Sequence, residues 1–218
     1  MDRIDLFQQT SLEGVSDLQL FYGELSERMD LLRHQTGFTC IEKCGKCCNV
    51  ASEKIETTIF EMLPLALHFI RLNKHDEILE LLKSDNLGKD TCIMYKKLND
   101  DGSQGYCSAY VNRPLICRLF GAAVRIKSDD SKEFVMCKLL KEIVAKNPSL
   151  SDLADKMVVI QEVVGNARGL NVNLTSELYN INEGLKLAIE HILFRLRWFD
   201  PTDHNPTSTN NNNFDLVA

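Results

Sequence analysis

Eight cysteines, all confined to the middle of a 218-residue chain, constrain this sequence more than any other feature. They lie between Cys40 and Cys137, and both flanks contain none. This density is well below that of small disulfide-stapled domains, and a chain of this length can bury a core without staples. The thiols therefore call for a chemical role, and metal binding is the first one to consider.

The termini and the charge bear on where such thiols would reside. The N-terminal MDRIDLFQQTSLEG lacks the basic and apolar segments of a secretory signal, and no apolar run is long enough to span a membrane. We therefore expect a cytoplasmic protein, with no membrane partner, in which thiols stay reduced. The net charge of −6 gives no basic footprint for nucleic acid. A disulfide-stabilised interaction domain is the least favoured alternative.

The densest part of the cysteine region is the segment CIEKCGKCC, which carries Cys40, Cys44, Cys47 and Cys48. The two-residue spacing between Cys44 and Cys47 lets both sulfurs face one metal ion. Gly45 allows backbone amides to turn toward sulfur. Cys47 and Cys48 are adjacent, and an extended backbone would send their side chains to opposite sides. The pair therefore indicates two neighbouring centres or two corners of one cluster.

Four further cysteines follow in a turn-rich stretch, namely Cys92, Cys107, Cys117 and Cys137. Pro114 sets a corner before Cys117. Arg113 and Arg118 flank that corner, where they can balance thiolate charge or donate hydrogen bonds to sulfur. A surface salt bridge is the ordinary alternative for both. Of the five histidines, only His34 is a candidate ligand, and a place at a helix end explains it more simply.

Apolar residues at helical spacing surround this region. They predict a helix over about 15–36 ended by Gly37, and Thr58 with Glu61 forms a capping box for a second helix. Residues 85–118 are expected to form loops and short strands, held by something other than apolar burial. Further elements are expected as helices at about 75–84, from near Phe134, from Ser151 to about Val164 and from Thr175 or Ser176 to near Leu196, and as a short strand at about 122–126.

The predicted fold is mainly α, with helices surrounding an irregular cysteine-rich metal-binding core. We expect one domain over residues 1–200, in which the cysteine-rich part is 40–137 and the helical flanks are 14–37 and 150–199. Residues 201–218 are polar and low in complexity, so they should form a disordered tail.

The chain resembles the bacterial CxxCxxCC family of zinc- or iron-chelating proteins. The resemblance spans residues 40–137 and rests on CIEKCGKCC, Cys92, Cys107, the string YVNRPLICR at 110–118, and Cys137. It implies that all eight cysteines chelate zinc or iron, with an iron–sulfur cluster as one form. A related branch is similar to the flagellin lysine N-methylases. That branch supplies an alternative function, an iron–sulfur-dependent protein lysine N-methylase or redox enzyme, although this sequence lacks a glycine-rich nucleotide loop.

Overall fold

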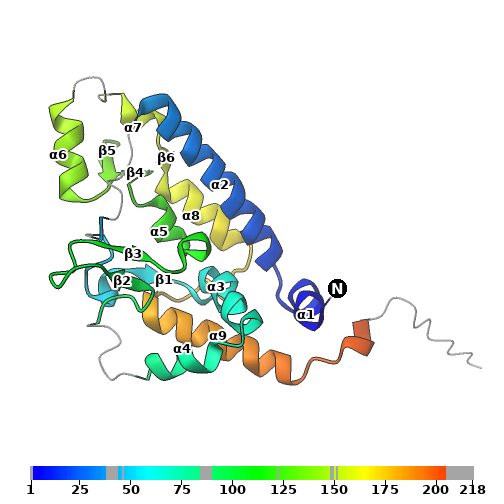
Figure 1. The fold of residues 1–218 in the computed structure, drawn as a ribbon. Coiled ribbons are helices and arrows are strands. Elements are labelled where there is room, and N and C mark those ends of the chain that lie inside the picture. The colour runs from blue at the N-terminus through cyan, green and yellow to red at the C-terminus, as the bar shows by residue number, and fades with distance from the viewer. Residues whose placement is uncertain are drawn as a thin grey trace, which may run out of the picture.

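The computed structural model describes residues 2–37, 44–45, 47–83, 90–121, 123–147, 150 and 152–204. Within these ranges helices form most of the secondary structure, and the strands make three small sheets of two or three strands each. The mainly α prediction is therefore confirmed. Figure 1 shows the sheets gathered on one side of the molecule, next to long helices that cross it.

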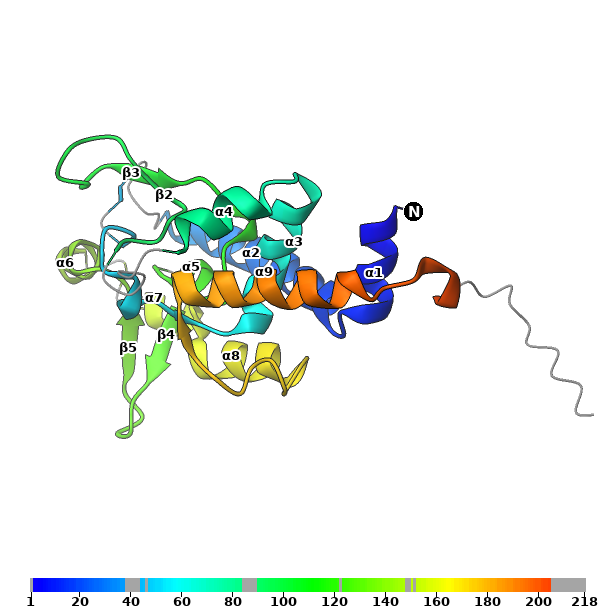
Figure 2. The ribbon, with the colours of Figure 1, turned by 90° about the horizontal axis from the view of Figure 1, so that it is seen from below.

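The centre of the fold is helix α3, Ile59–Arg71, which packs against α9, Ile181–Arg197. Helix α3 is apolar on nearly all sides, and its residues from Phe60 to Leu67 are all buried. Helices α1, Arg3–Ser11, α2, Val15–Thr36, and α8, Ile160–Gly169, add to the same hydrophobic core, and α4, His75–Leu81, covers another side. Figure 2 shows α9 crossing the molecule alongside α3 and α4.

Two predicted helix boundaries match the structure and have visible causes. Helix α2 ends at Gly37, which adopts a left-handed backbone with φ of 63° and donates its N–H to the Arg33 carbonyl. Helix α3 begins after Thr58, whose Oγ1 accepts a hydrogen bond from the Glu61 N–H at 3.2 Å. The Glu61 carboxylate accepts from the Thr57 hydroxyl at 3.0 Å, so only half of the predicted capping box forms in the expected way.

A second, smaller hydrophobic cluster lies beside the main core. Strand β4, Ala123–Ile126, pairs antiparallel with β5, Lys132–Val135, and parallel with β6, Val158–Val159. Helices α6, Lys138–Lys146, and α7, Leu153–Lys156, contribute to this cluster with the end of α2. Its buried members are Leu32, Val124, Met136, Leu140, Leu150, Leu153 and Met157. The strand predicted at about 122–126 is confirmed for the described residues 123–126.

The helices predicted after residue 130 differ from the structure in two places. The segment near Phe134 is strand β5, and the helix begins only at Lys138. The helix expected from Ser151 to Val164 is two helices separated by β6, because β-branched Val158 and Val159 pair with β4. Ser151 itself lies outside the described residues.

The last helix also starts later than expected. Its N-cap is Asn180, whose Oδ1 accepts from the Glu183 N–H at 3.0 Å. The two predicted caps serve the preceding turn instead, where the Thr175 hydroxyl donates to the Asn171 carbonyl at 2.8 Å and the Ser176 hydroxyl to a carbonyl of the same turn. The capping residues of a turn and of a helix N-terminus are the same types, so sequence alone did not separate them.

Short elements make up the region that carries the cysteines. They are the 3-10 helices η1, Ser52–Lys54, and η2, Tyr110–Asn112, the strands β1, Glu56–Thr57, β2, Tyr95–Lys97, and β3, Gly105–Cys107, and the short helix α5, Leu115–Leu119. Strand β1 pairs with β7, Tyr179–Asn180, from the C-terminal part of the chain. The prediction of loops and short strands over 85–118 is confirmed by β2 and β3, but it missed the helical turns of η2 and α5. The expectation that apolar burial does not hold it is wrong, because Met94, Ala109, Leu115 and Leu119 are buried in the main core.

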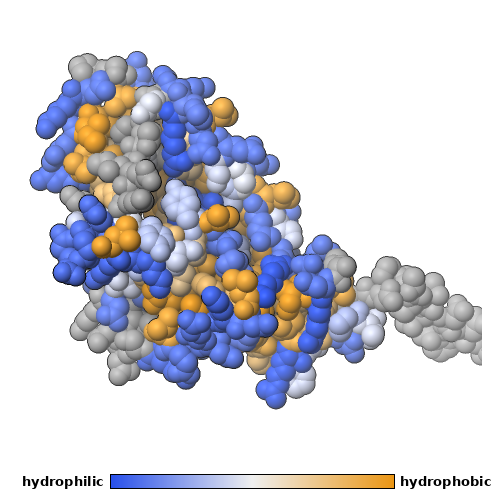
Figure 3. All heavy atoms as spheres, viewed as in Figure 1, coloured by the Kyte–Doolittle hydropathy of each residue, from blue (hydrophilic) through white to orange (hydrophobic). Residues whose placement is uncertain are grey.

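The last described residues and the outer surface show no further large element. Pro201–His204 form a 3-10 helix, and residues 205–218 of the predicted tail lie outside the described part. Among the helices that the structure describes, none has the length and apolar character to cross a membrane. On the face drawn in Figure 3, hydrophobic side chains appear in separate groups between hydrophilic ones.

Candidate metal centre

The first cysteine segment lies against the β2–β3 hairpin. Cys44 forms a β-bridge with Gln104, and the Gly45 N–H donates to the Ser103 carbonyl at 3.2 Å. The Asn49 side chain donates to the Asp101 carbonyl at 3.0 Å. Hydrogen bonds from the Gly45 backbone and the Asn49 side chain therefore hold this segment on the hairpin. Cys40 lies outside the described residues.

The hairpin itself brings Cys92 and Cys107 to one end. The N–H of Tyr95 donates to the Cys92 carbonyl at 2.9 Å, and Tyr95 is the register partner of Cys107. Residues directly opposite each other in an antiparallel pair project to the same face of the sheet. Two cysteines that are distant in the sequence are therefore neighbours of a single tyrosine.

Cys117 arrives on α5. Pro114 caps this short helix with φ of −66°, and the Cys117 N–H donates to the Pro114 carbonyl at 3.1 Å. The predicted corner at Pro114 is thus present. Cys92, Cys107 and Cys117 all pack against the main hydrophobic core, so each sits at the boundary between the core and the hairpin.

Cys47 and Cys48 point toward each other. Their Sγ atoms are 3.8 Å apart. The expectation that adjacent cysteines diverge is wrong here, because residues 47 and 48 lie in a turn and not in extended backbone. Their shared hydrogen bond lowers the pKa of Cys47 and raises that of Cys48, so the pair holds one proton more tightly than the other.

The pKa values of the thiols also show which of them feel one another's charge. Burial, followed by repulsion from Cys92, Cys107 and Cys47, raises the pKa of Cys117 to about 12, and Arg113 opposes the shift. Burial, and then Cys107, raises the pKa of Cys92 to about 11. Five thiols from three separate segments, those of Cys92, Cys107, Cys117 and the Cys47–Cys48 pair, therefore share one electrostatic environment.

Among the described residues, Arg113 is a cation whose charge reaches this environment. Its charge favours the thiolate forms of Cys47, Cys107 and Cys117, and so opposes the rise in pKa that burial causes at Cys107 and Cys117. The guanidinium lies 3.5 Å above the Tyr110 ring and donates through Nη1 to the Cys117 carbonyl at 3.3 Å. This placement suits a group that offsets the charge of several thiolates.

Arg118 is placed differently. It is 9% exposed and stacks on the Tyr22 ring of α2 at 4.3 Å. Its Nε donates to the Arg113 carbonyl at 2.8 Å, and its two terminal nitrogens reach the Ser26 hydroxyl and the Val111 carbonyl. These acceptors tie the 111–113 turn to α2. These hydrogen bonds go to two carbonyls and a hydroxyl, and not to sulfur or to a carboxylate as the sequence suggested. A role for Arg118 in holding a cofactor stays a prediction.

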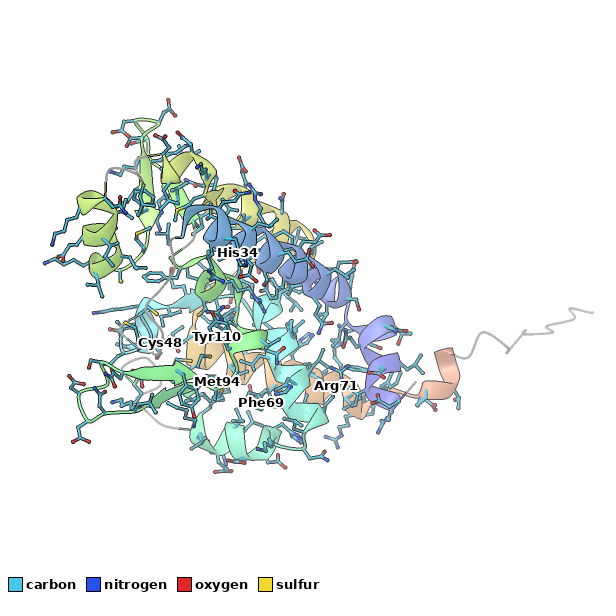
Figure 4. All side chains as sticks on the ribbon, turned by 45° about the horizontal axis from the view of Figure 1, so that its top comes forward. His34, Cys48, Phe69, Arg71, Met94 and Tyr110 are labelled. Carbon is cyan, nitrogen blue, oxygen red and sulfur yellow. The ribbon has the colours of Figure 1, made fainter. Side chains whose placement is uncertain are left out.

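Two other candidates lie elsewhere. Cys137 is the N-cap residue of α6 and packs with the second hydrophobic cluster. His34 is exposed on α2, and Figure 4 places it away from Cys48, whereas Tyr110 lies on the same side as Cys48. Within the described residues, no three histidine, cysteine, aspartate or glutamate side chains already converge on one ion position.

Two residues that sequence reasoning missed support the cysteine segments. Asn182 of α9 is 1% exposed, accepts from the Ile93 N–H at 3.0 Å and donates to the Thr91 carbonyl at 3.1 Å. It therefore fixes the backbone on both sides of Cys92. Tyr95 is 7% exposed and contacts two cysteine-bearing arms, which are the Cys44–Cys48 segment and the β2–β3 hairpin. In the sequence, the aromatic Tyr95 directly before Lys96 and Lys97 is a weak signal that the tyrosine faces the core.

The chemistry of the donors fits a thiophilic metal. The gathered side chains are soft sulfur ligands with an arginine beside them, which suits zinc or an iron–sulfur centre better than magnesium or calcium.

The comparison with protein families agrees with this chemistry. Residues 39–139 match the model of the CxxCxxCC family, described as a putative zinc- or iron-chelating domain. The matched segment contains all eight cysteines and both arginines of the turn. Neither a curated protein nor a solved structure matches the chain.

Proposed function

We propose that the protein binds zinc or iron through its cysteine thiolates, and that the thiols of the Cys44–Cys48 segment, Cys92, Cys107 and Cys117 form the centre. The observation that carries the proposal is the shared environment of thiols from three segments separated by up to 70 residues. Cys40 and Cys137 complete the ligand set that the family match suggests.

The chain's own groups prepare this site in two ways. The partly buried position of the thiols excludes much of the water that would compete for a metal. Arg113 supplies positive charge beside thiolates, which would otherwise repel one another. A bound zinc ion would supply structural cross-links between the three segments, and an iron–sulfur cluster would add redox capacity.

The decisive experiment is elemental analysis of protein purified without oxygen, with a visible absorption spectrum of the same sample. Zinc without visible absorption identifies a zinc protein, and iron with sulfide and a broad visible band identifies a cluster. Protein that holds neither metal, and that takes up neither after reconstitution, contradicts the proposal.

Single substitutions then test whether the segments share one centre. Cys47→Ser and Cys117→Ser should each lower the bound metal strongly, although they are far apart in sequence. Full loading of Cys117→Ser with none in Cys47→Ser would show that the two segments bind separately. Cys137→Ser is the informative companion, because its loading reports whether α6 contributes a ligand.

A further inference from the structure

We propose that Tyr95 is a positioning residue that assembles the Cys44–Cys48 segment on the β2–β3 hairpin before a metal binds. This inference rests on the proposed function and names the side chain that prepares its site.

The contacts of Tyr95 reach both arms of the site. Its hydroxyl donates to the Gly102 carbonyl, across the hairpin loop. Its backbone N–H holds the Cys92 carbonyl, and its register partner is Cys107. The Cys44–Cys48 segment lies beside the ring, because Gly45 is so close that a Cβ there would meet the Tyr95 hydroxyl.

Two glycines make room for the ring. A Cβ added at Gly45 would lie 1.8 Å from the Tyr95 hydroxyl oxygen, and one added at Gly105 would lie 2.4 Å from the ring. Such distances are far below van der Waals contact. An alanine at Gly45 therefore pushes the Cys44–Cys48 segment away from the hairpin, whereas one at Gly105 disturbs the hairpin itself. Gly45 lies between Cys44 and Cys47, where a shift of the backbone moves their sulfur atoms.

A site assembled in advance loses less conformational freedom when it binds its ligand. In the metal-free protein the ring therefore holds the two arms together, which metal ligation would otherwise have to do alone. Lys96 and Tyr106, which alternate with Tyr95 and Cys107 along the two strands, face solvent and take no part.

The first test measures cobalt(II) binding by the full chain, because cobalt reports thiolate ligation by its absorption. Gly45→Ala should weaken binding by about 10-fold or more, in the range of losses outside the ligand shell. Its thiolate-to-cobalt band per bound ion should also fall, which a general loss of stability would not cause. Gly165→Ala is the matched control, because nothing lies within 4 Å of a Cβ there. Equal binding by both variants would overturn the proposal.

A double substitution tests the contact itself. Tyr95→Ala should weaken binding, and adding Gly45→Ala to it should cost little more, because the ring that the new methyl group meets is gone. Losses that multiply across the two substitutions would show that Gly45 and Tyr95 act separately. Tyr95→Phe isolates the hydroxyl, and exposed Tyr106→Phe is its control.

The second test separates this inference from metal binding as such. In the metal-free chain, N-ethylmaleimide should label Cys44 and Cys47 faster in Gly45→Ala than in the wild type or in Gly165→Ala. Unchanged labelling rates would refute the positioning role of Tyr95 even if the protein binds metal. Faster labelling would support it even if no metal bound, a result that would refute the proposed function alone.

Discussion

Arg113 and Arg118 are five residues apart, and the structure predicts opposite consequences for their removal. Arg118 donates to two backbone carbonyls and one hydroxyl while stacked on a buried ring. In Arg118→Ala each part-buried carbonyl that loses its donor costs about 1–3 kcal/mol, and the lost stacking about 1–2 kcal/mol. Since water can partly replace the donors, we expect a loss of about 3–5 kcal/mol. A typical domain has about 5–15 kcal/mol in total.

Arg113→Ala should cost much less stability. Its two hydrogen bonds go to one exposed and one part-buried carbonyl, and the part-buried one is long, at 3.3 Å, so about 1 kcal/mol is expected. It should instead weaken metal binding by about 10–100-fold, because its charge acts on three thiols. Arg118→Lys is the second variant for the buried site, since a lysine keeps the charge but cannot reach three acceptors at fixed angles.

The assay is urea unfolding of the reduced, metal-free variants, followed by circular dichroism, with zinc competition on the folded samples. Thermal melts of the same samples give a second readout: for a chain of this size, about 2–4 °C per kcal/mol predicts that Arg118→Ala melts roughly 10 °C lower. The control is exposed Arg125→Ala on β4, which should change neither quantity. The reasoning is refuted if Arg118→Ala is within about 1 kcal/mol of the wild type, or if both arginine variants lose the same stability.

Three further predictions concern single groups. Asn182→Ala should lower the free energy of unfolding by about 2–3 kcal/mol in urea, because two backbone groups beside Cys92 lose their partner; a change below 0.5 kcal/mol or so would contradict this. Burial raises the pKa of Glu61, so its contribution to stability is full below its unfolded pKa and is lost as pH rises through the folded pKa. Glu61→Gln should therefore gain stability relative to the wild type between pH 4 and pH 7, as measured by thermal melts, and a constant difference would disprove the assignment. Zinc binding at pH 7.5 should release protons, because the pKa values of Cys92 and Cys117 are raised to about 11 and 12. Calorimetry in buffers of different ionisation enthalpy measures the release, and identical heats would refute it.

The helix boundaries that sequence predicted correctly are those set by local signals. Gly37 ends α2 because glycine adopts the left-handed backbone at little cost, and Thr58 starts α3 because its hydroxyl reaches the third amide. The corner at Pro114 is local in the same sense, since the ring fixes its own φ. Each of these depends on a few consecutive residues, so no distant partner had to be known.

The errors fall where pairing is long-range. Val158 and Val159 are strand residues because β4, about 35 positions earlier, offers them hydrogen-bond partners. The different roles of Arg113, beside the thiols, and Arg118, in the turn, likewise depend on α2, which presents Tyr22 and Ser26 to Arg118. No spacing within the YVNRPLICR string distinguishes a guanidinium that faces thiols from one that faces carbonyls.

By itself, the sequence determined the chemistry of this protein: soft thiol donors in one half of the chain, a mainly helical frame, and a cationic turn beside Cys117. Only the tertiary structure decided the geometry, in which a turn directs the Cys47 and Cys48 sulfurs together and Tyr95 joins the two arms. The physical reason is that ligand type is a property of single residues. The relative position of ligands depends on contacts between segments that only the folded chain brings together.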